Sequence, residues 1–305
     1  MSELPPGTVE LIARALDEDL GSGDVTAEAT VPADLQAGAK IVLKQPGVVF
    51  GLEVIEQVFR QAGATDFDRM AMEGHWHDAV PLDVALIHGP ARAILAGERV
   101  ALNFLGHLSG ISTLTAQFVD AVAGTGARIL DTRKTTPGMR MLEKQAVSWG
   151  GGLNHRIGLY DAVLIKENHI AVAGGLSKAV EACREAQPEL AIEVEAETTG
   201  QVEEAIASGA DRILLDNMSP DELRAAVTRR HAAGESAGRP IGDRDPGAGS
   251  PELGAAGSPE LEASGGIDLD NVREVAETGV DFISIGALTH SAPVLDFSLL
   301  LDPVT

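Results

Sequence analysis

The chain has 305 residues, of which 46 are acidic and 23 basic, so its formal net charge at pH 7 is −23. A surface this acidic repels nucleic-acid phosphates and anionic lipids, and neither is expected as a partner. The single cysteine, Cys183, excludes an intrachain disulfide and fits a reducing compartment. Only six basic residues are lysines, which suggests adaptation to a very salty cytoplasm, where screening weakens surface repulsion.

Two features of the chain argue against export or membrane insertion. Residues 1–21 are acidic and amphipathic, without the basic segment, apolar core and small-residue cleavage site of a secretion signal. Apolar runs such as 128–131 and 162–165 have the length of strands and are too short to span a bilayer. We therefore expect a soluble cytoplasmic protein.

The elements divide the chain into two parts with different patterns. Residues 1–110 mix a helix at 8–20, a strand at 39–45 and a further apolar segment at 47–63. From about residue 111, strand-like and helical segments alternate, which is typical of parallel strands. The strand candidates are 127–135, 160–168, 191–197, 211–217, 261–267 and 280–288, with helices between them such as 176–187 and 200–209.

Each strand candidate begins with apolar residues and ends in charged, Ser or Gly residues, as in α/β barrels whose active-site groups come from the strand ends. Six strands fall short of eight, so either the barrel is incomplete or one or two strands are hidden in the helical segment near 140–155. Residues 229–260 are dense in Gly, Pro, Ser and Ala. We interpret them as a flexible acidic insertion between barrel elements.

Cations gather in one stretch, residues 131–169, of a chain that has few of them. They are Arg133, Lys134, Arg140, Lys144, His155, Arg156 and Lys166. An ion-pair network with the abundant carboxylates is one reading. Their position near strand ends favours a pocket for a ligand with several anionic groups, since Arg offers a planar fork and Lys a point charge.

Carboxylates stand at other strand ends, namely Glu167, Glu193, Glu195, Glu197 and Asp216. Glu193, Glu195 and Glu197 share one face of their strand, so at least one should meet Lys or Mg²⁺ if that face is buried. Glu197 could equally lie at a solvated edge.

Glycine-rich turns follow the last two strands, at Ser264-Gly265-Gly266 and 284–287, where backbone N–H groups could cradle a phosphate. His75 and His77 have the spacing of metal ligands on a strand. No third ligand is nearby in the sequence, so a surface turn is the better interpretation than a zinc site. Cys183 lies in an alanine-rich helical run and is interpreted as a packed thiol.

Several long motifs, in order along nearly the whole chain, resemble the quinolinate phosphoribosyltransferases. They are EDLGSGDVT (18–26), ERVALNFLGHLSGIST (98–113), DTRKTTPGMRMLEKQAV (131–147), GGGLNHRIGLYDAVLIKENH (150–169), IEVEAE, LLDNM, EASGGI and ISIGALTHS (283–291). The resemblance implies an α/β fold with an N-terminal α/β sandwich domain (1–110) and an incomplete, seven-stranded α/β barrel (111–290) that contains the insertion. Residues 291–305 would pack back on the N-terminal domain.

The resemblance also implies roles for residues. Arg99 would reach into the pocket of a neighbouring subunit in a homodimer or larger oligomer. Arg133, His155, Arg156 and Lys166 would surround the pyridine dicarboxylate quinolinate, and Lys134 would be shared with the donor, phosphoribosyl pyrophosphate. Glu195 and Asp216 would lie near the ribose hydroxyls and Mg²⁺, which binds mainly through the donor pyrophosphate. Ser264, Gly265, Gly266, Gly286 and His290 would form the 5′-phosphate site, and Lys134, Lys166, Glu195 and Asp216 would be catalytic.

The implied reaction yields nicotinate mononucleotide, pyrophosphate and CO₂, a step of de novo NAD biosynthesis. Three alternatives stay open. A pyrophosphorylase of the same fold with another acceptor would differ only in the acceptor pocket. A Schiff-base aldolase would use Lys166 as its nucleophile. A noncatalytic metabolite-binding protein would give no reason for carboxylates to face cations across strand ends.

Overall fold

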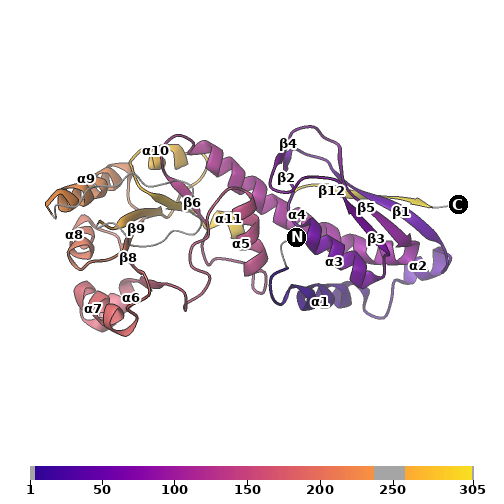
Figure 1. Ribbon diagram of the computed structural model, residues 1–305, viewed down its shortest axis with the longest axis horizontal. Helices are drawn as coiled ribbons and strands as arrows, with labels where there is room; N and C mark the ends of the chain where they lie inside the picture. The colour runs from indigo at the N-terminus through magenta and orange to yellow at the C-terminus, as the bar shows by residue number, and fades with distance from the viewer. Residues whose placement is uncertain (1–3, 237–257, 304–305) are drawn as a thin grey trace. The chain divides into compact units, whose positions relative to one another are not determined.

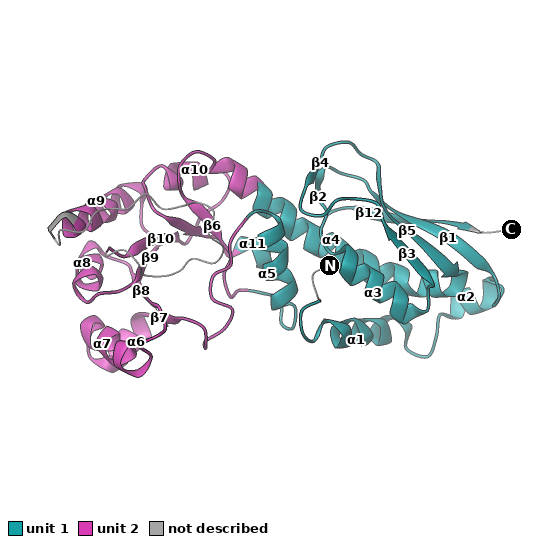
Figure 2. Cartoon of the chain, in the orientation of Figure 1, with its two compact units in different colours: residues 1–116, 135–151, 287–305 teal, residues 117–134, 152–286 magenta. Residues whose placement is uncertain are grey.

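The computed structural model describes residues 4–236 and 258–303 (Figure 1). The chain forms two compact units, which Figure 2 shows in different colours. Unit 1 holds residues 1–116, 135–151 and 287–305, and unit 2 holds 117–134 and 152–286. The sequence motifs had placed the whole of 111–290 in one barrel domain. In the structure, 135–151 belong to unit 1 instead.

Unit 1 is built on an antiparallel sheet of four strands in the order β12-β1-β5-β3. Its strands are β1 (Gln36–Leu43), β3 (Asp66–Arg69), β5 (Leu82–Pro90) and β12 (Phe297–Pro303). Strand β12, near the C-terminus, pairs antiparallel with β1 from Ala37 to Leu43. The last strand of the chain is therefore part of the N-terminal sheet.

The helices of unit 1 bury apolar faces, in keeping with the amphipathic pattern of the sequence. They are α1 (Thr8–Leu20), α2 (Val25–Thr30), α3 (Leu52–Ala62), α5 (Arg140–Trp149), α11 (Ala287–His290) and α4 (Ala91–Ala121) as far as residue 116. The long helix α4 carries two buried hydroxyls toward the chain before α3. Thr113 Oγ1 accepts a hydrogen bond from Val48 N at 2.9 Å, and Ser109 Oγ accepts one from Phe50 N at 3.0 Å. Here Val48 belongs to the short pair β2 (Gly47–Val48) and β4 (Trp76–His77).

Unit 2 holds a parallel sheet of six strands in the order β6-β11-β10-β9-β8-β7. The strands are β6 (Arg128–Leu130), β7 (Val163–Ile165), β8 (Ile192–Ala196), β9 (Arg212–Asp216), β10 (Glu260–Ser264) and β11 (Phe282–Ser284). They coincide with the six strand candidates. Leu153 adds a single parallel bridge to Leu130 beside β6, in the interval where a hidden strand was sought. The incomplete α/β barrel is thus confirmed, with six described strands and one bridge.

The two faces of this sheet differ in chemistry. One face carries apolar residues such as Val194, Ile213 and Ala263, all nearly inaccessible. The helices α6 (Glu167–Ala173), α7 (Leu176–Ala186), α8 (Thr199–Ala207), α9 (Pro220–Ser236) and α10 (Val272–Ala276) follow the strands, and α7 to α10 line the outside of the sheet in Figure 1. The opposite, inner face carries the charged side chains Glu193, Arg212 and Glu262. The candidate site is therefore sought on this inner face.

The insertion expected at 229–260 is only partly described. Helix α9 extends to Ser236, so residues 229–236 are helical rather than part of a loop. Strand β10 already begins at Glu260, and residues 237–257 lie outside the described part of the chain. Among the described residues, no helix is both long enough and apolar enough to cross a membrane.

Candidate functional site

The strand ends of unit 2 bring together most of the residues singled out in the sequence. Because the carboxyl ends of parallel strands meet at one edge of a sheet, groups that end successive strands become neighbours. This edge carries Arg133 and Lys134 after β6, Lys166 after β7, Glu195 in β8, Asp216 at the end of β9, Ser264 at the end of β10 and Gly286 after β11. The carboxylates and cations of the sequence therefore do meet across the sheet.

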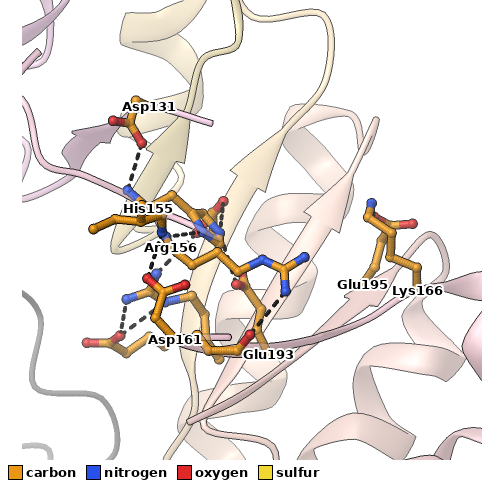
Figure 3. A network of polar contacts seen from close by, with 12 residues as sticks. Asp131, His155, Arg156, Asp161, Lys166, Glu193 and Glu195 are labelled. Atoms are coloured by element: carbon orange, nitrogen blue, oxygen red, sulfur yellow. Dashed lines mark hydrogen bonds and ion pairs between the residues drawn. The ribbon is translucent and has the colours of Figure 1, made fainter. Parts of the chain in front are cut away.

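Lys166 and Glu195 form an ion pair between the ends of β7 and β8 (Figure 3). The Lys166 side chain is 48% exposed and that of Glu195 only 10% exposed. This pair satisfies the expectation that one carboxylate of β8 meets a lysine. Glu197, two residues further on, is exposed, as expected for a solvated strand edge.

Two arginines at this edge of the sheet, Arg133 and Arg156, act on each other electrostatically. Burial, and next the charge of Arg133, lower the pKa of the Arg156 guanidinium. Arg156 is held in place from one side by its Nη1, which donates to the Ala162 carbonyl at 3.0 Å. The segment between Arg156 and Ala162 is held by Asp161, whose carboxylate accepts hydrogen bonds from Ile157 N and Gly158 N. Two guanidinium groups that act on each other electrostatically suit an anionic ligand.

His155 lies deeper than the sequence suggested, and its contacts are to protein groups (Figure 3). Its Nε2 lies 3.0 Å from Glu193 Oε2, and its Nδ1 accepts a hydrogen bond from Arg156 N at 2.7 Å. Its own backbone N donates to Asp131 Oδ1 at 2.8 Å. Both ring nitrogens are therefore engaged, and the ring holds the backbone at Arg156.

A buried ionic layer beneath the strand ends was not recognised as part of the site from the sequence. Arg212 donates to Glu260 Oε2 from Nε at 3.2 Å and from Nη2 at 2.8 Å, and to Glu262 Oε2 from Nη1 at 3.3 Å. Arg212 is 3% exposed and Glu262 is 0% exposed. The only sequence signal for this layer is the alternation of charged and apolar residues within strands that are otherwise buried.

The turn after β10 packs closely against Asn217, the residue that follows β9. Gly265 has φ +95°, and a Cβ there would lie 2.2 Å from Asn217 Oδ1. Asn217 itself has φ 55°, donates from its backbone N to the Ser264 carbonyl, and donates from its side chain to Asp216 Oδ2. Glycine is thus required at Gly265, and Asn217 is a site residue that the sequence reasoning missed. A residue other than glycine with a left-handed backbone is the structural signal for it.

The other predicted residues belong to unit 1. Arg99 is exposed on α4 and lines a hollow of about 380 Å³ with Glu18, Asp19 and His107. His290 is exposed at the end of α11, with Nδ1 2.6 Å from Ser291 Oγ. Arg140 and Lys144 lie on α5, and Lys144 is only 1% exposed. The cation cluster of 131–169 is therefore divided between the units.

Glu143 is a further buried group that the sequence reasoning missed. Its carboxylate lies 2.8 Å from His107 Nε2 and accepts from Thr136 N at 3.0 Å. It is 0% exposed. It thereby anchors the segment that leads from Lys134 into α5.

The one group of three potential metal ligands among the described residues is His155, Glu193 and Glu262. A metal at Nε2 of a neutral histidine needs the ring proton on Nδ1, but Nδ1 of His155 accepts the Arg156 N–H. That trio is therefore unsuited to a metal. The turn at His75 and His77 forms no such group within the described chain, and their rings contact the Glu73 and Met72 carbonyls.

Comparison with known proteins gives a consistent answer. Residues 111–300 match the family described as "Quinolinate phosphoribosyl transferase, C-terminal domain", and 24–109 match the corresponding N-terminal domain. The chain is 40% identical over 295 residues to the nicotinate-nucleotide pyrophosphorylase [carboxylating] of Mycobacterium leprae, covering 95% of each chain. It is 41% identical to a probable enzyme of that name from Bacillus subtilis, covering 92% of this chain and 89% of the relative. A solved nicotinate-nucleotide pyrophosphorylase from Francisella tularensis superposes with a TM-score of 0.86 at 34% identity, covering 98% of both chains. The chain therefore belongs to the quinolinate phosphoribosyltransferase family.

Proposed function

We propose that the chain transfers a phosphoribosyl group from phosphoribosyl pyrophosphate to quinolinate and releases CO₂, giving nicotinate mononucleotide and pyrophosphate. The observation that carries this proposal is that Arg133 and Arg156 act on each other electrostatically at the strand ends of a family member. Two guanidinium groups that act on each other in this way repel, and a ligand with two adjacent carboxylates would bind both.

Arg133, Arg156 and Lys166 are proposed to bind the acceptor. Quinolinate carries two carboxylates next to the ring nitrogen, so a bidentate guanidinium for each would fix the plane of the ring. Lys134 is exposed beside Arg133, and its ammonium is assigned to both the acceptor and the donor. These contacts aim the ring nitrogen at the anomeric carbon, and positioning of this kind lowers the barrier of a bimolecular step.

The donor is proposed to lie over the ends of β8 to β11. The turn at Ser264, Gly265 and Gly266 offers backbone N–H groups to the 5′-phosphate, with Gly286 and His290 completing that site. Glu195 and Asp216 are placed near the ribose, where carboxylates stabilise the positive charge that develops as pyrophosphate leaves.

Magnesium is proposed as the cofactor. The described residues offer no cage of ligands at Asp216 or Glu195, and Mg²⁺ commonly binds one or two carboxylates together with substrate phosphates. Asp216 suits this role better than Glu195, whose carboxylate is engaged by Lys166. The ion would neutralise charge on the departing pyrophosphate.

Decarboxylation needs no dedicated base in this site. Once the ring nitrogen is bonded to ribose, the ring is cationic and can accept the electron pair left at the adjacent carbon when CO₂ departs. The arginines then have only to hold the ring in place. An aldolase would require an uncharged Lys166 amine in apolar surroundings, whereas Lys166 is half exposed and paired with Glu195.

We further propose that the enzyme works in the cytoplasm as a homodimer or larger assembly, with Arg99 completing a neighbouring subunit's acceptor pocket. Its exposure on α4 supports this role. The proposal makes the oligomer part of the active site.

The test is steady-state kinetics with quinolinate, phosphoribosyl pyrophosphate and Mg²⁺, following nicotinate mononucleotide and CO₂ together. Arg133→Ala or Arg156→Ala should raise the KM for quinolinate by about 100-fold, since each removes a bidentate ionic contact, and should leave the KM for the donor nearly unchanged. Arg224→Ala is the matched control, because Arg224 is 48% exposed and pairs only with surface carboxylates. Turnover only with another acceptor would overturn the acceptor assignment.

A further inference from the structure

The inner face of the unit 2 sheet carries more buried negative charge than positive charge. The parallel register sets Glu193 beside Arg212, and Arg212 beside Glu260. Glu262 is next on the same face of β10, and all four side chains are at most 11% exposed. Arg212 thus has three buried carboxylates around it, and an isolated buried charge is costly.

The donors of this layer do not satisfy its acceptors. Arg212 directs two of its three hydrogen bonds to Glu260 and one to Glu262. Glu193 Oε1 and Glu262 Oε1 are buried and have no hydrogen-bond partner among the residues that the structure describes. Oxygens of these two carboxyl groups lie within 4.8 Å of each other and of His155 Nε2. One proton on Glu262 would supply a donor for Glu193 and remove one negative charge.

His155 is not the place for that proton. Its Nδ1 already accepts the Arg156 N–H, so the neutral ring carries its proton on Nε2 and donates it to Glu193. A second proton would have to break the bond to Arg156. Glu262 offers a site for it that costs no existing hydrogen bond.

We propose that Glu262 is a positioning residue of the acceptor pocket that works as a neutral carboxylic acid: its carboxyl O–H donates to Glu193, which holds His155, which in turn orients Arg156. This chain of contacts runs from the centre of the barrel to the backbone N–H of Arg156, whose guanidinium is assigned to the substrate, so the inference rests on the proposed function. Glu262 touches no substrate and acts only through these neighbours.

The surroundings of Glu262 support a retained proton. Burial, and next the Glu193 carboxylate, raise the pKa of Glu262 to about 7, although His155, Arg212 and the Ser284 hydroxyl act to lower it. Glu260, on the same strand, faces Arg212 instead. From β6, Arg128 lies over the Phe282 ring at 4.8 Å. Burial lowers the pKa of His155, and the Glu262 and Glu193 carboxylates more than offset this effect. Because His155 Nδ1 already accepts the Arg156 N–H, the additional proton is assigned to Glu262.

Two substitutions at Glu262, with side chains of similar length, distinguish a hydrogen-bond donor from a side chain that only fills the space. Glu262→Gln keeps an N–H donor without a charge, so its KM for quinolinate should stay within about twofold of wild type at pH 6.5. Glu262→Met keeps the volume without a donor, and its KM for quinolinate should rise about tenfold, the usual consequence of one lost buried hydrogen bond. Neither variant should change the KM for phosphoribosyl pyrophosphate, and Glu274→Gln, on the exposed face of α10, is the control.

The pH profile gives a readout that a merely structural role would not move. In the wild type, ionisation of Glu262 above pH 7 removes the donor and adds a charge behind the pocket, so the KM for quinolinate should rise. The Glu262→Gln variant should lack that rise. Equal KM values for the Gln and Met variants, or an unchanged alkaline rise in the Gln variant, would overturn the proposal.

The proton itself can be observed without turnover. The infrared spectrum of the folded wild type at pH 6 should show the carbonyl band of a protonated carboxylic acid that is lost in Glu262→Gln. Its absence would refute the inference even if the enzyme is active. Its presence in a protein that does not use quinolinate would refute the proposed function and leave the protonated Glu262 standing.

Discussion

Arg212 is the position where a single substitution tests the buried ionic layer most severely. The change Arg212→Met keeps much of the side-chain volume and its contact with the Phe282 ring, over which the guanidinium lies at 4.2 Å. It removes the three hydrogen bonds to Glu260 and Glu262. Breaking a buried ion pair by removing one partner typically costs about 3–5 kcal/mol, because the remaining charge is left uncompensated. We expect a loss of this size in the free energy of unfolding.

The assay is urea unfolding at pH 7.5, followed by circular dichroism, with Arg224→Met as the control. Arg224 forms exposed pairs with Asp221 and Glu274, so that variant should lose no more than about 0.5 kcal/mol. Adding Glu260→Gln and Glu262→Gln to Arg212→Met should restore much of the loss, since two of the three buried carboxylates around position 212 are then uncharged and Glu193 keeps its contact with His155. A loss below about 1 kcal/mol in Arg212→Met, or no recovery in the triple variant, would refute the reasoning.

Four further outcomes are expected. The pKa of Glu262 rises from 4.5 to about 7 on folding, so between these pH values the folded wild type holds a proton that the unfolded chain loses. The free energy of unfolding should therefore fall by on the order of 3 kcal/mol as the pH rises through this range. Glu262→Gln, measured by urea unfolding from pH 5 to 8, should not show this fall. Gly265→Ala forces a Cβ against Asn217 at positive φ and should raise the KM for phosphoribosyl pyrophosphate but not that for quinolinate; equal effects on both would contradict a phosphate turn. Mixed Arg99→Ala and Lys134→Ala subunits, each inactive alone, should recover about a quarter of wild-type activity after co-refolding if each site of a dimer borrows Arg99; no recovery would argue against sharing. If the net charge of −23 reflects salt adaptation, thermal unfolding should shift to higher temperature in molar KCl, and a decrease would exclude it.

The sequence predicted the positions of the parallel strands well, for a physical reason. Each strand is short, apolar on one face and followed by Gly, Ser or a charged residue, so its C-terminal end is marked in the sequence. This placed Lys166, Asp216 and Ser264 at one edge of the sheet, as the structure shows. The strand limits were less accurate, since the segment 127–135 contains a strand of only three residues, Arg128–Leu130.

Which charges pair with each other could not be predicted. Glu193 and Glu195 are alike in sequence and lie on one strand face, yet Glu193 meets His155 and Glu195 meets Lys166. The choice depends on strand order and register across the sheet, which the sequence of β8 alone does not contain. The same holds for Arg212, whose partners Glu260 and Glu262 come from a strand about 50 residues further along.

The division of the cation-rich stretch was hidden for a related reason. Residues 131–169 read as one cluster, but the chain passes into unit 1 at 135–151 and returns. There Lys144 is buried on α5, and Glu143 binds the Thr136 N–H. Neither amphipathic pattern nor charge density indicates that a helix within such a stretch packs in a different unit.

The most direct test of the central claim is the fate of the 2-carboxyl group of the acceptor. Quinolinate labelled with ¹³C in that group should be incubated with the wild type, phosphoribosyl pyrophosphate and Mg²⁺, and the products measured by mass spectrometry. The account predicts one labelled CO₂ for each unlabelled nicotinate mononucleotide, with the rate of both strongly reduced in Arg133→Ala at a quinolinate concentration below the wild-type KM. Label retained in a nucleotide product, or no nucleotide at all while another acceptor is consumed, would contradict it.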